Sequence, residues 1–519
     1  MPISKLHRSK ISLRDESAIR PLLIAVLFSP IVVLLFHALE RQQADNLLPA
    51  FFSTDHLTWF YWTQARFGNV LPVIAFPIQD IRWNLIVQVL LRVSSMLFVT
   101  FWFSQIVSVI TFVKREYLLF VSLFFFLVFV HFYTDGGDSI LYGANAHPLA
   151  LPFVVLAVSC ISPKDISFER LWGRTLFALA LTFVFWWIAL WTSILVILWA
   201  PIFILLGVIV SSRQHPVSLL IVFRYIGFQI LCLSINGLFW IGIARRGGED
   251  SRYTWVGSFE ALMSHSYIYK SAILAAVLIL LSIFFVRSWR SASLIVSSSA
   301  LLVSIYLIAA LNHVRAYEFS PRYFAVPLFL GALIPFLFLT SRFVEIITRL
   351  RAVKLLSDSL IGVMPYFRIA IIALFGVSFI LIGTVKIGYG LGKPDAIGFN
   401  NTGRVVELAE FVEFQKKSHS LPQFISGNYW DVWPTVFELR TRGVNVLALT
   451  KKAEFQRDFW SLYTGREIVG VCIDTVEKCY GSTINAQLHG KQLQSNIDAE
   501  PLMVLSNGIE LRLMKVWKP

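Results

Sequence analysis

The sequence predicts an α-helical polytopic membrane protein of about 11 transmembrane helices, followed by a C-terminal extracytoplasmic α/β domain. The first observation is composition: 56% of the 519 residues are hydrophobic and only 15% are charged, whereas soluble domains carry about 25% charged residues. The second is a series of apolar runs long enough to cross a hydrocarbon layer of about 30 Å. The third is a change to polar composition after Gly388.

The apolar runs define a transmembrane bundle, which we expect over residues 21–389, after a basic cytoplasmic tail at residues 1–20. The first run is long enough to span and lacks a small-residue cleavage site after it, so we expect a helix there and not a cleaved signal peptide. An odd number of crossings then places the C-terminus outside. The expected spans are 21–39, 85–112, 117–133, 147–161, 175–190, 194–210, 217–243, 271–286, 291–311, 323–340 and 369–389.

Loop charge supports this orientation. Every expected cytoplasmic loop carries Lys or Arg, whereas the short outer loops at 134–146 and 191–193 carry neither. Basic residues gather on the cytoplasmic side of membrane proteins, and this also accounts for the net charge of +14 without nucleic-acid binding. One segment stays open: the apolar run 175–210 fits two short helices or one span with a re-entrant piece.

Residues 390–519 predict an extracytoplasmic α/β domain. The stretch 422–450 has the pattern of a strand, a short helix and a strand, and 502–517 reads as a hairpin around Ser-Asn-Gly. Cys472 and Cys479 flank a turn in this domain, where an oxidising compartment would permit a disulfide between them. The sequence leaves open whether that disulfide forms.

The outer loops combine acids, cations and aromatic residues. The first, residues 40–84, is too long for a simple connector and carries Asp55 soon after the first span. Asp55 is the candidate catalytic residue. The candidate substrate-binding residues are His56, Asp80, Arg82, Arg92, Asp135, Asp138, His147, Arg322 and Tyr323.

Most of these residues also have ordinary structural explanations. A loop Asp is commonly a cap, the Asp-Gly-Gly-Asp stretch at 135–138 suits a turn, and Arg82 suits a membrane anchor. Arg92 is harder to explain, because it lies about two turns inside an apolar helix, where a lone charge costs roughly 2.5–3.5 kcal/mol. It requires an acidic partner, a snorkelling path to the interface or an anionic ligand such as a lipid phosphate.

Taken together, these residue types suit sugar transfer from a lipid-phosphate donor. A carboxylate can take the proton from the acceptor hydroxyl as a general base. Cationic side chains stabilise the departing phosphate. Aromatic planes suit sugar faces, and an apolar groove suits a polyprenyl tail.

This plan resembles the C-type (GT-C) integral membrane glycosyltransferases, in particular bacterial members that use polyprenyl-phosphate sugars. Those proteins have a cytoplasmic N-terminus, a long first outer loop with an acid soon after the first span, and in many cases an outer C-terminal domain. The stretch SPRYFAVPLFLGALIPFLF, residues 320–338, is similar to the Arg-Tyr start of a late span in them. The resemblance covers the whole chain as architecture, although its motifs are short.

The resemblance implies a role for several residues. Asp55 would be the general base, Asp135 or Asp138 the second acidic group that holds acceptor or metal, and Arg322 with Tyr323 a contact for the donor phosphate. Some members have two nearly adjacent acids in the first loop, whereas here Asp55 is followed by His56. We therefore expect transfer without a cofactor, with a divalent metal as the less favoured alternative.

The resemblance further implies a bacterial inner-membrane protein that acts on its outer face. The donor would be a polyprenyl-phosphate sugar, and the acceptor a cell-envelope glycan or lipid such as O-antigen, lipid A or a wall polymer. The sugar, the acceptor, the stereochemistry and the oligomeric state stay open.

Two other classes fit parts of the sequence. A transporter or flippase of lipid-linked sugars would normally show internal repeats, and we find none. A non-catalytic envelope-polysaccharide assembly protein would use residues 393–519 as a binding module. There GNYWDVWP, residues 427–434, suits a carbohydrate-stacking surface, although aromatic core packing is the favoured explanation.

Overall fold

The computed structural model describes most of the chain. The described residues are 19–36, 44–55, 57, 60–61, 64–132, 146–161, 174–214, 218–246, 254–255, 258–316, 323–352, 402–419, 423–450, 468–477, 479, 494–504 and 510–517. They belong to two compact units. The first, called the helical unit, contains Met1–Val32, Leu91–Leu141 and Asn145–Thr384; the second, called the mixed unit, contains Val33–Leu90, Tyr142–Ala144 and Val385–Pro519.

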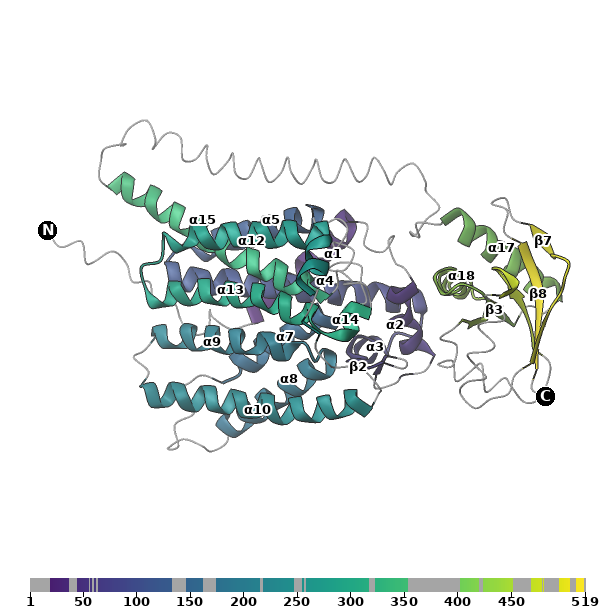
Figure 1. Ribbon diagram of the computed structural model, residues 1–519, viewed down its shortest axis with the longest axis horizontal. Helices are drawn as coiled ribbons and strands as arrows, with labels where there is room; N and C mark the ends of the chain where they lie inside the picture. The colour runs from purple at the N-terminus through teal and green to yellow at the C-terminus, as the bar shows by residue number, and fades with distance from the viewer. Residues whose placement is uncertain are drawn as a thin grey trace. The chain divides into compact units, whose positions relative to one another are not determined.

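The helical unit consists of long apolar helices that lie side by side (Figure 1). Apolar side chains of α10 (Leu219–Arg246), such as Leu219, Phe223 and Leu238, are 65–74% exposed, as expected for a surface that faces lipid. The helices are α1 (Ile19–Leu35), α4 (Ile81–Thr111), α5 (Arg115–Phe132), α7 (Ala146–Ser159), α8 (Arg174–Thr192), α9 (Val196–Gln214), α10 (Leu219–Arg246), α11 (Ser258–Ser264), α12 (Ser266–Ile283), α13 (Trp289–Ala309), α14 (Asn312–Ala316) and α15 (Ala325–Ala352). The last residues of α1 and the first ten of α4 belong to the mixed unit.

Several of these helices identify a membrane protein. Among the described residues, five helices are long and apolar enough to cross a membrane, within α4, α8, α10, α13 and α15. Four shorter apolar helices accompany them. The expected span at 369–389 lies outside the described residues, so the number of about 11 spans stays a prediction.

The structure decides the ambiguous run 175–210 in favour of two helices. α8 ends at Thr192 and α9 begins at Val196. Between them the backbone hydrogen bonds join residues three apart instead of four. The Val196 amide donates to the Ser193 carbonyl at 3.2 Å and the Ile197 amide to the Ile194 carbonyl at 3.1 Å. A tight turn of this kind separates two helices and leaves the Ser193 side chain beyond the end of α8.

The mixed unit joins residues 40–84, which the sequence predicts to be the first outer loop, to the C-terminal part of the chain. The loop is more than a connector, as its length predicts, because it forms two helices and a hairpin. These elements are α2 (Ala44–Thr54), β1 (Phe60–Tyr61), β2 (Gln64–Gly68) and α3 (Val70–Ala75). The C-terminal elements are α17 (Thr402–His419), β3 (Phe424–Ser426), α18 (Tyr429–Thr441), β4 (Leu447–Leu449), β5 (Ile468–Cys472), β6 (Gln494–Ile497), β7 (Met503–Val504) and β8 (Glu510–Trp517).

The C-terminal sheet has the strand order β4-β3-β5-β8-β6, with β7 paired to β8. β3 pairs in parallel with both β4 and β5, and β8 runs antiparallel to its neighbours. The β3–α18–β4 unit confirms the pattern predicted over 422–450, and the β7–β8 pair confirms the hairpin over 502–517. Figure 1 shows α17 and α18 beside this sheet.

Local sequence explains how α18 begins and ends. Asn428 is its N-cap, with the side-chain oxygen accepting from the Trp430 amide at 3.3 Å. After its C-terminus, Gly443 adopts a φ of +76°, which favours glycine and closes the helix. Cys472 and Cys479 form a disulfide within the sheet core, which settles the question that the sequence leaves open.

Candidate functional site

Asp55, the candidate catalytic residue, lies at the end of α2. The Asp55 amide donates to the Phe51 carbonyl at 2.8 Å. This is the hydrogen bond of an α-helix, so Asp55 extends the hydrogen bonding of α2 by one residue. Residues four apart share one face of a helix. The Phe51 ring and the Asp55 carboxylate therefore lie next to each other on the same side of α2.

That face of α2 packs against one face of α18. The Phe51 ring lies edge-on to Trp433 and Phe437, with ring centroids 5.0 and 6.1 Å apart. Arg440 follows on the same helical face, seven residues after Trp433, and its guanidinium carbon lies 5.0 Å from the centroid of the Phe51 ring. Pairs of this kind contribute roughly 0.5–1.5 kcal/mol each beyond area burial.

Arg440 and Asp55 form an ion pair at the end of this contact. Their side chains are 13% and 15% exposed. Two hydrogen bonds from described residues reach the Asp55 carboxylate, and Oδ1 accepts both. The donors are the Arg440 guanidinium and the Thr54 hydroxyl, the latter at 3.4 Å. Oδ2 of Asp55 accepts no hydrogen bond from any residue that the structure describes, and Nε of Arg440 is buried without one among the same residues. The pair thus presents one oxygen that can take a proton and a cation that can bind an anion.

The opposite face of α2 is held by amides of α4. Asn84 donates to the Ser53 hydroxyl at 2.8 Å and to the carbonyls of Ala75 and Ile78 at 2.9 and 2.8 Å. Gln88, one turn further on, donates to the Pro49 carbonyl at 3.0 Å and to Asn84 Oδ1 at 2.7 Å. Both amides are fully buried. α2 is therefore fixed on both sides, and the position of Asp55 depends on both contacts.

A second, more exposed ion-pair group lies on α18. Arg442 contacts Glu438 at 3.0 Å and Glu413 at 3.4 Å, with side chains 22–25% exposed. Burial by itself would lower the pKa of Arg442, but the two carboxylates hold that pKa above its ordinary value. This group joins α17 to α18 and provides a natural comparison for the Asp55–Arg440 pair.

Asp80 and Arg82 occupy the start of α4. The Asp80 carboxylate accepts from the amides of Arg82 and Trp83, both at 3.0 Å, which makes it the N-cap of α4. Both side chains are exposed. Among the described residues no hydrogen bond or ion pair joins either of them to Asp55, so their predicted role in substrate binding gains no geometric support.

In the helical unit, the structure brings together two of the predicted residues. His147, at the start of α7, and Tyr323, just before α15, have ring centroids 5.6 Å apart. His147 Nδ1 lies 2.6 Å from the Ser193 hydroxyl, and its ring is edge-on to Trp199 at 6.2 Å. His147 and Tyr323 are at most 1% exposed. They form a buried polar cluster, and polar groups inside a membrane bundle are commonly functional.

Arg92 lies in the part of α4 that belongs to the helical unit and is 2% exposed. A snorkelling side chain extends along a surface to reach the interface. Such burial contradicts the snorkelling explanation and leaves an internal partner or an anionic ligand.

Four predicted residues lie outside the described part of the chain: His56, Asp135, Asp138 and Arg322. Their roles stay predictions. The residues that the structure describes include no group of three or more His, Cys, Asp or Glu side chains able to hold a metal ion. Transfer without a metal also stays a prediction, because two of the acids in question are among those not described.

Sequence reasoning missed two residues of these clusters. Arg440 is the first. Trp433, Phe437 and Arg440 lie four and three residues apart, a helical spacing that places a cation on the same face as two aromatic residues and that could have indicated its position. Ser193 is the second, and only the break between α8 and α9 reveals its position.

Comparisons with known proteins add no assignment: no protein-family model matches this chain, and no curated protein matches it significantly.

Proposed function

We propose that this membrane protein is a glycosyltransferase that uses a polyprenyl-phosphate sugar, with Asp55 as the general base. The observation that carries the proposal is the Asp55–Arg440 ion pair. In it a largely buried carboxylate lies beside a cation, and its Oδ2 accepts no hydrogen bond from the described residues. The acceptor would be a cell-envelope glycan or lipid.

The reaction breaks the bond between the anomeric carbon and the phosphate oxygen of the donor. The acceptor oxygen forms the new bond to that carbon, and its proton passes to Oδ2 of Asp55. The leaving group is the polyprenyl phosphate, which keeps the bonding electrons. Arg440 has two tasks, because it holds the carboxylate through Oδ1 and supplies positive charge close to the phosphate.

We further propose about eleven spans, with the N-terminus in the cytoplasm and the mixed unit outside. Loop charge supports this orientation. The Cys472–Cys479 disulfide also supports it, because disulfides persist in oxidising compartments outside the cytosol. Labelling of a cysteine introduced at Ser420 with a membrane-impermeant reagent in intact cells tests the topology. Reaction only after the membrane is permeabilised would contradict it.

Activity is tested with membranes that contain the protein, a labelled polyprenyl-phosphate sugar and endogenous acceptors. We expect Asp55→Asn to lower transfer at least about 100-fold, the range that general-base catalysis contributes, while protein abundance is retained. Glu438→Gln is the matched control, because it also changes an ion-paired carboxylate of the mixed unit to an amide. Equal transfer by the Asp55→Asn variant and the wild type would refute the assignment.

A purely structural role for the pair is the main rival, and it favours a non-catalytic assembly protein. The charge reversal Asp55→Arg with Arg440→Asp separates the two. If the pair only clamps α2 to α18, the double variant regains both the stability and any transfer that the single variants lose. If Asp55 is the base, the double variant regains stability but stays inactive in transfer.

A further inference from the structure

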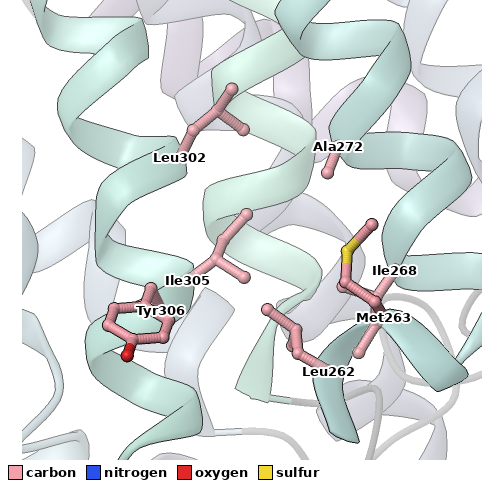
Figure 2. Close-up of a pocket in the computed structure, with 7 residues that line it drawn as sticks. All are labelled: Leu262, Met263, Ile268, Ala272, Leu302, Ile305 and Tyr306. Carbon is pink, nitrogen blue, oxygen red and sulfur yellow. The ribbon is translucent and has the colours of Figure 1, made fainter. Parts of the chain in front are cut away.

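The helical unit contains an apolar cavity of about 400 Å³ that the proposed reaction does not use. Three elements line it: α11 contributes Leu262 and Met263, α12 contributes Ile268 and Ala272, and α13 contributes Leu302, Ile305 and Tyr306. Figure 2 shows the α13 side chains on one side of the cavity and those of α12 on the other. Its size lies within the range of ligand pockets.

The cavity borders a surface that suits the bilayer interior. Beyond Ala272, α12 continues with apolar side chains that are 45–59% exposed, among them Ile273, Val277 and Leu280. A helix that exposes such residues in a membrane faces lipid tails. The cavity lies at the end where α12 begins and α13 ends, and the exposed apolar part of α12 starts directly beyond its lining residue Ala272.

A polar and aromatic rim lies at this same end. The Trp255 ring packs on the Tyr306 ring that lines the cavity, with centroids 5.6 Å apart. Arg315 of α14 donates to the Thr254 carbonyl at 3.2 Å and to the Ser258 hydroxyl at 3.1 Å. Ser258 is the first residue of α11, one turn before the lining residue Leu262. A cation and two amphipathic rings thus border an otherwise apolar cavity, as at membrane interfaces.

Local charge is positive at the rim. Besides Arg315, the described Lys and acidic side chains within two residues of the lining are Lys270 and Glu260, both exposed, and His265 and Tyr269 are the other titratable neighbours. The two cations exceed the single acid. An anionic head group would therefore be attracted to this end of the cavity.

We propose that this cavity binds one chain of an anionic membrane phospholipid, with the lipid phosphate at Arg315. Moving a chain from the bilayer into an apolar cavity changes its surroundings little. Selectivity then comes from the head group, through charge-assisted hydrogen bonds to the guanidinium. The site is separate from the Asp55–Arg440 pair and does not depend on glycosyl transfer.

The test uses the full-length protein, purified in detergent and stripped of lipid, and measures thermal unfolding with added lipid. The probes are dioleoylphosphatidylglycerol, dioleoylphosphatidylcholine with the same chains, glycerol 3-phosphate as head group alone, and polyprenyl phosphate. We expect saturable stabilisation by phosphatidylglycerol at concentrations roughly tenfold below those of phosphatidylcholine. Equal stabilisation by the two phospholipids, or stabilisation by polyprenyl phosphate or glycerol 3-phosphate in place of phosphatidylglycerol, would overturn the proposal.

Two variants locate the effect. Ala272→Phe fills the cavity, and Leu280→Phe is its control, because Leu280 is 59% exposed on the same helix and outside the lining. Arg315→Gln removes the charge and leaves a shorter polar side chain that can still donate an N–H. We expect Ala272→Phe and Arg315→Gln each to weaken the phosphatidylglycerol effect about tenfold or more. An unchanged effect in the folded Arg315→Gln variant would also overturn the proposal, even if Ala272→Phe did not fold.

Discussion

Removal of the Asn84 amide should loosen the helix that carries Asp55. Asn84→Ala does not leave every partner unsatisfied, because the Ser53 hydroxyl still donates to the Pro72 carbonyl at 2.9 Å and the Ala75 carbonyl still accepts from the Ile78 amide at 2.9 Å. The Ile78 carbonyl loses the bond from Asn84, and Gln88 loses its bond to Asn84 Oδ1. The Ile78 carbonyl is only partly buried and Gln88 keeps its bond to the Pro49 carbonyl, so the two losses together cost about 1–3 kcal/mol.

The expected loss of stability is therefore roughly 1–3 kcal/mol for the mixed unit. For a domain of 150–250 residues, 1 kcal/mol shifts the melting temperature by about 2–4 °C, so a drop of roughly 2 °C or more should be seen. Asn84→Asp should be at least as harmful, because it replaces two N–H donors with an oxygen that faces carbonyl oxygens.

The assay is thermal unfolding of the purified protein, with transfer activity measured alongside. Gln79→Ala is the matched control: its amide also donates to a backbone carbonyl, that of Phe76 at 2.6 Å, but the residue is exposed. We expect less than about 0.5 kcal/mol there. If Asn84→Ala melted at the same temperature as Gln79→Ala, the hydrogen-bonded support of α2 would not contribute as argued.

Further predictions concern the C-terminal sheet. Gly470→Ala should destabilise the mixed unit by about 1–3 kcal/mol, because the new Cβ would lie 2.5 Å from the buried Phe424 ring. Gly227→Ala on α10 is the control. Its new Cβ would have no neighbour within 4 Å, so stability should be unchanged or slightly raised. Denaturant titrations of both variants check this, and equal midpoints would contradict it. Alkylation of the unfolded chain should label two cysteines before reduction and four after; four labels without reductant would disprove the Cys472–Cys479 bond. Replacing both of these cysteines by Ser should cost about 2 kcal/mol, since the unfolded chain loses a constraint.

Much of the fold could be predicted because it depends on local composition. Apolar runs of sufficient length become helices wherever they lie in a bilayer, since the backbone must satisfy its own hydrogen bonds. The β3–α18–β4 unit and the final hairpin likewise carry their own periodicity and turn residues. The run 175–210 was ambiguous because it is almost continuously apolar, and the structure confirms the two-helix alternative, with the break at Ser193 between the expected spans 175–190 and 194–210.

The composition of the candidate site was decided by tertiary structure. Asp55 could be selected from its place after the first span, but its partner Arg440 lies 385 residues further along the chain. No local pattern connects two such positions, because their contact depends on how α2 packs against α18 and how Asn84 holds α2 from behind. In the same way His147 meets Ser193 and Tyr323 only when three helix ends converge. The sequence by itself determined which segments are helices, which are strands and where charge lies; side-chain packing between distant segments decided which charges and hydroxyls meet, since those contacts arise from the shapes of surfaces that form only on folding.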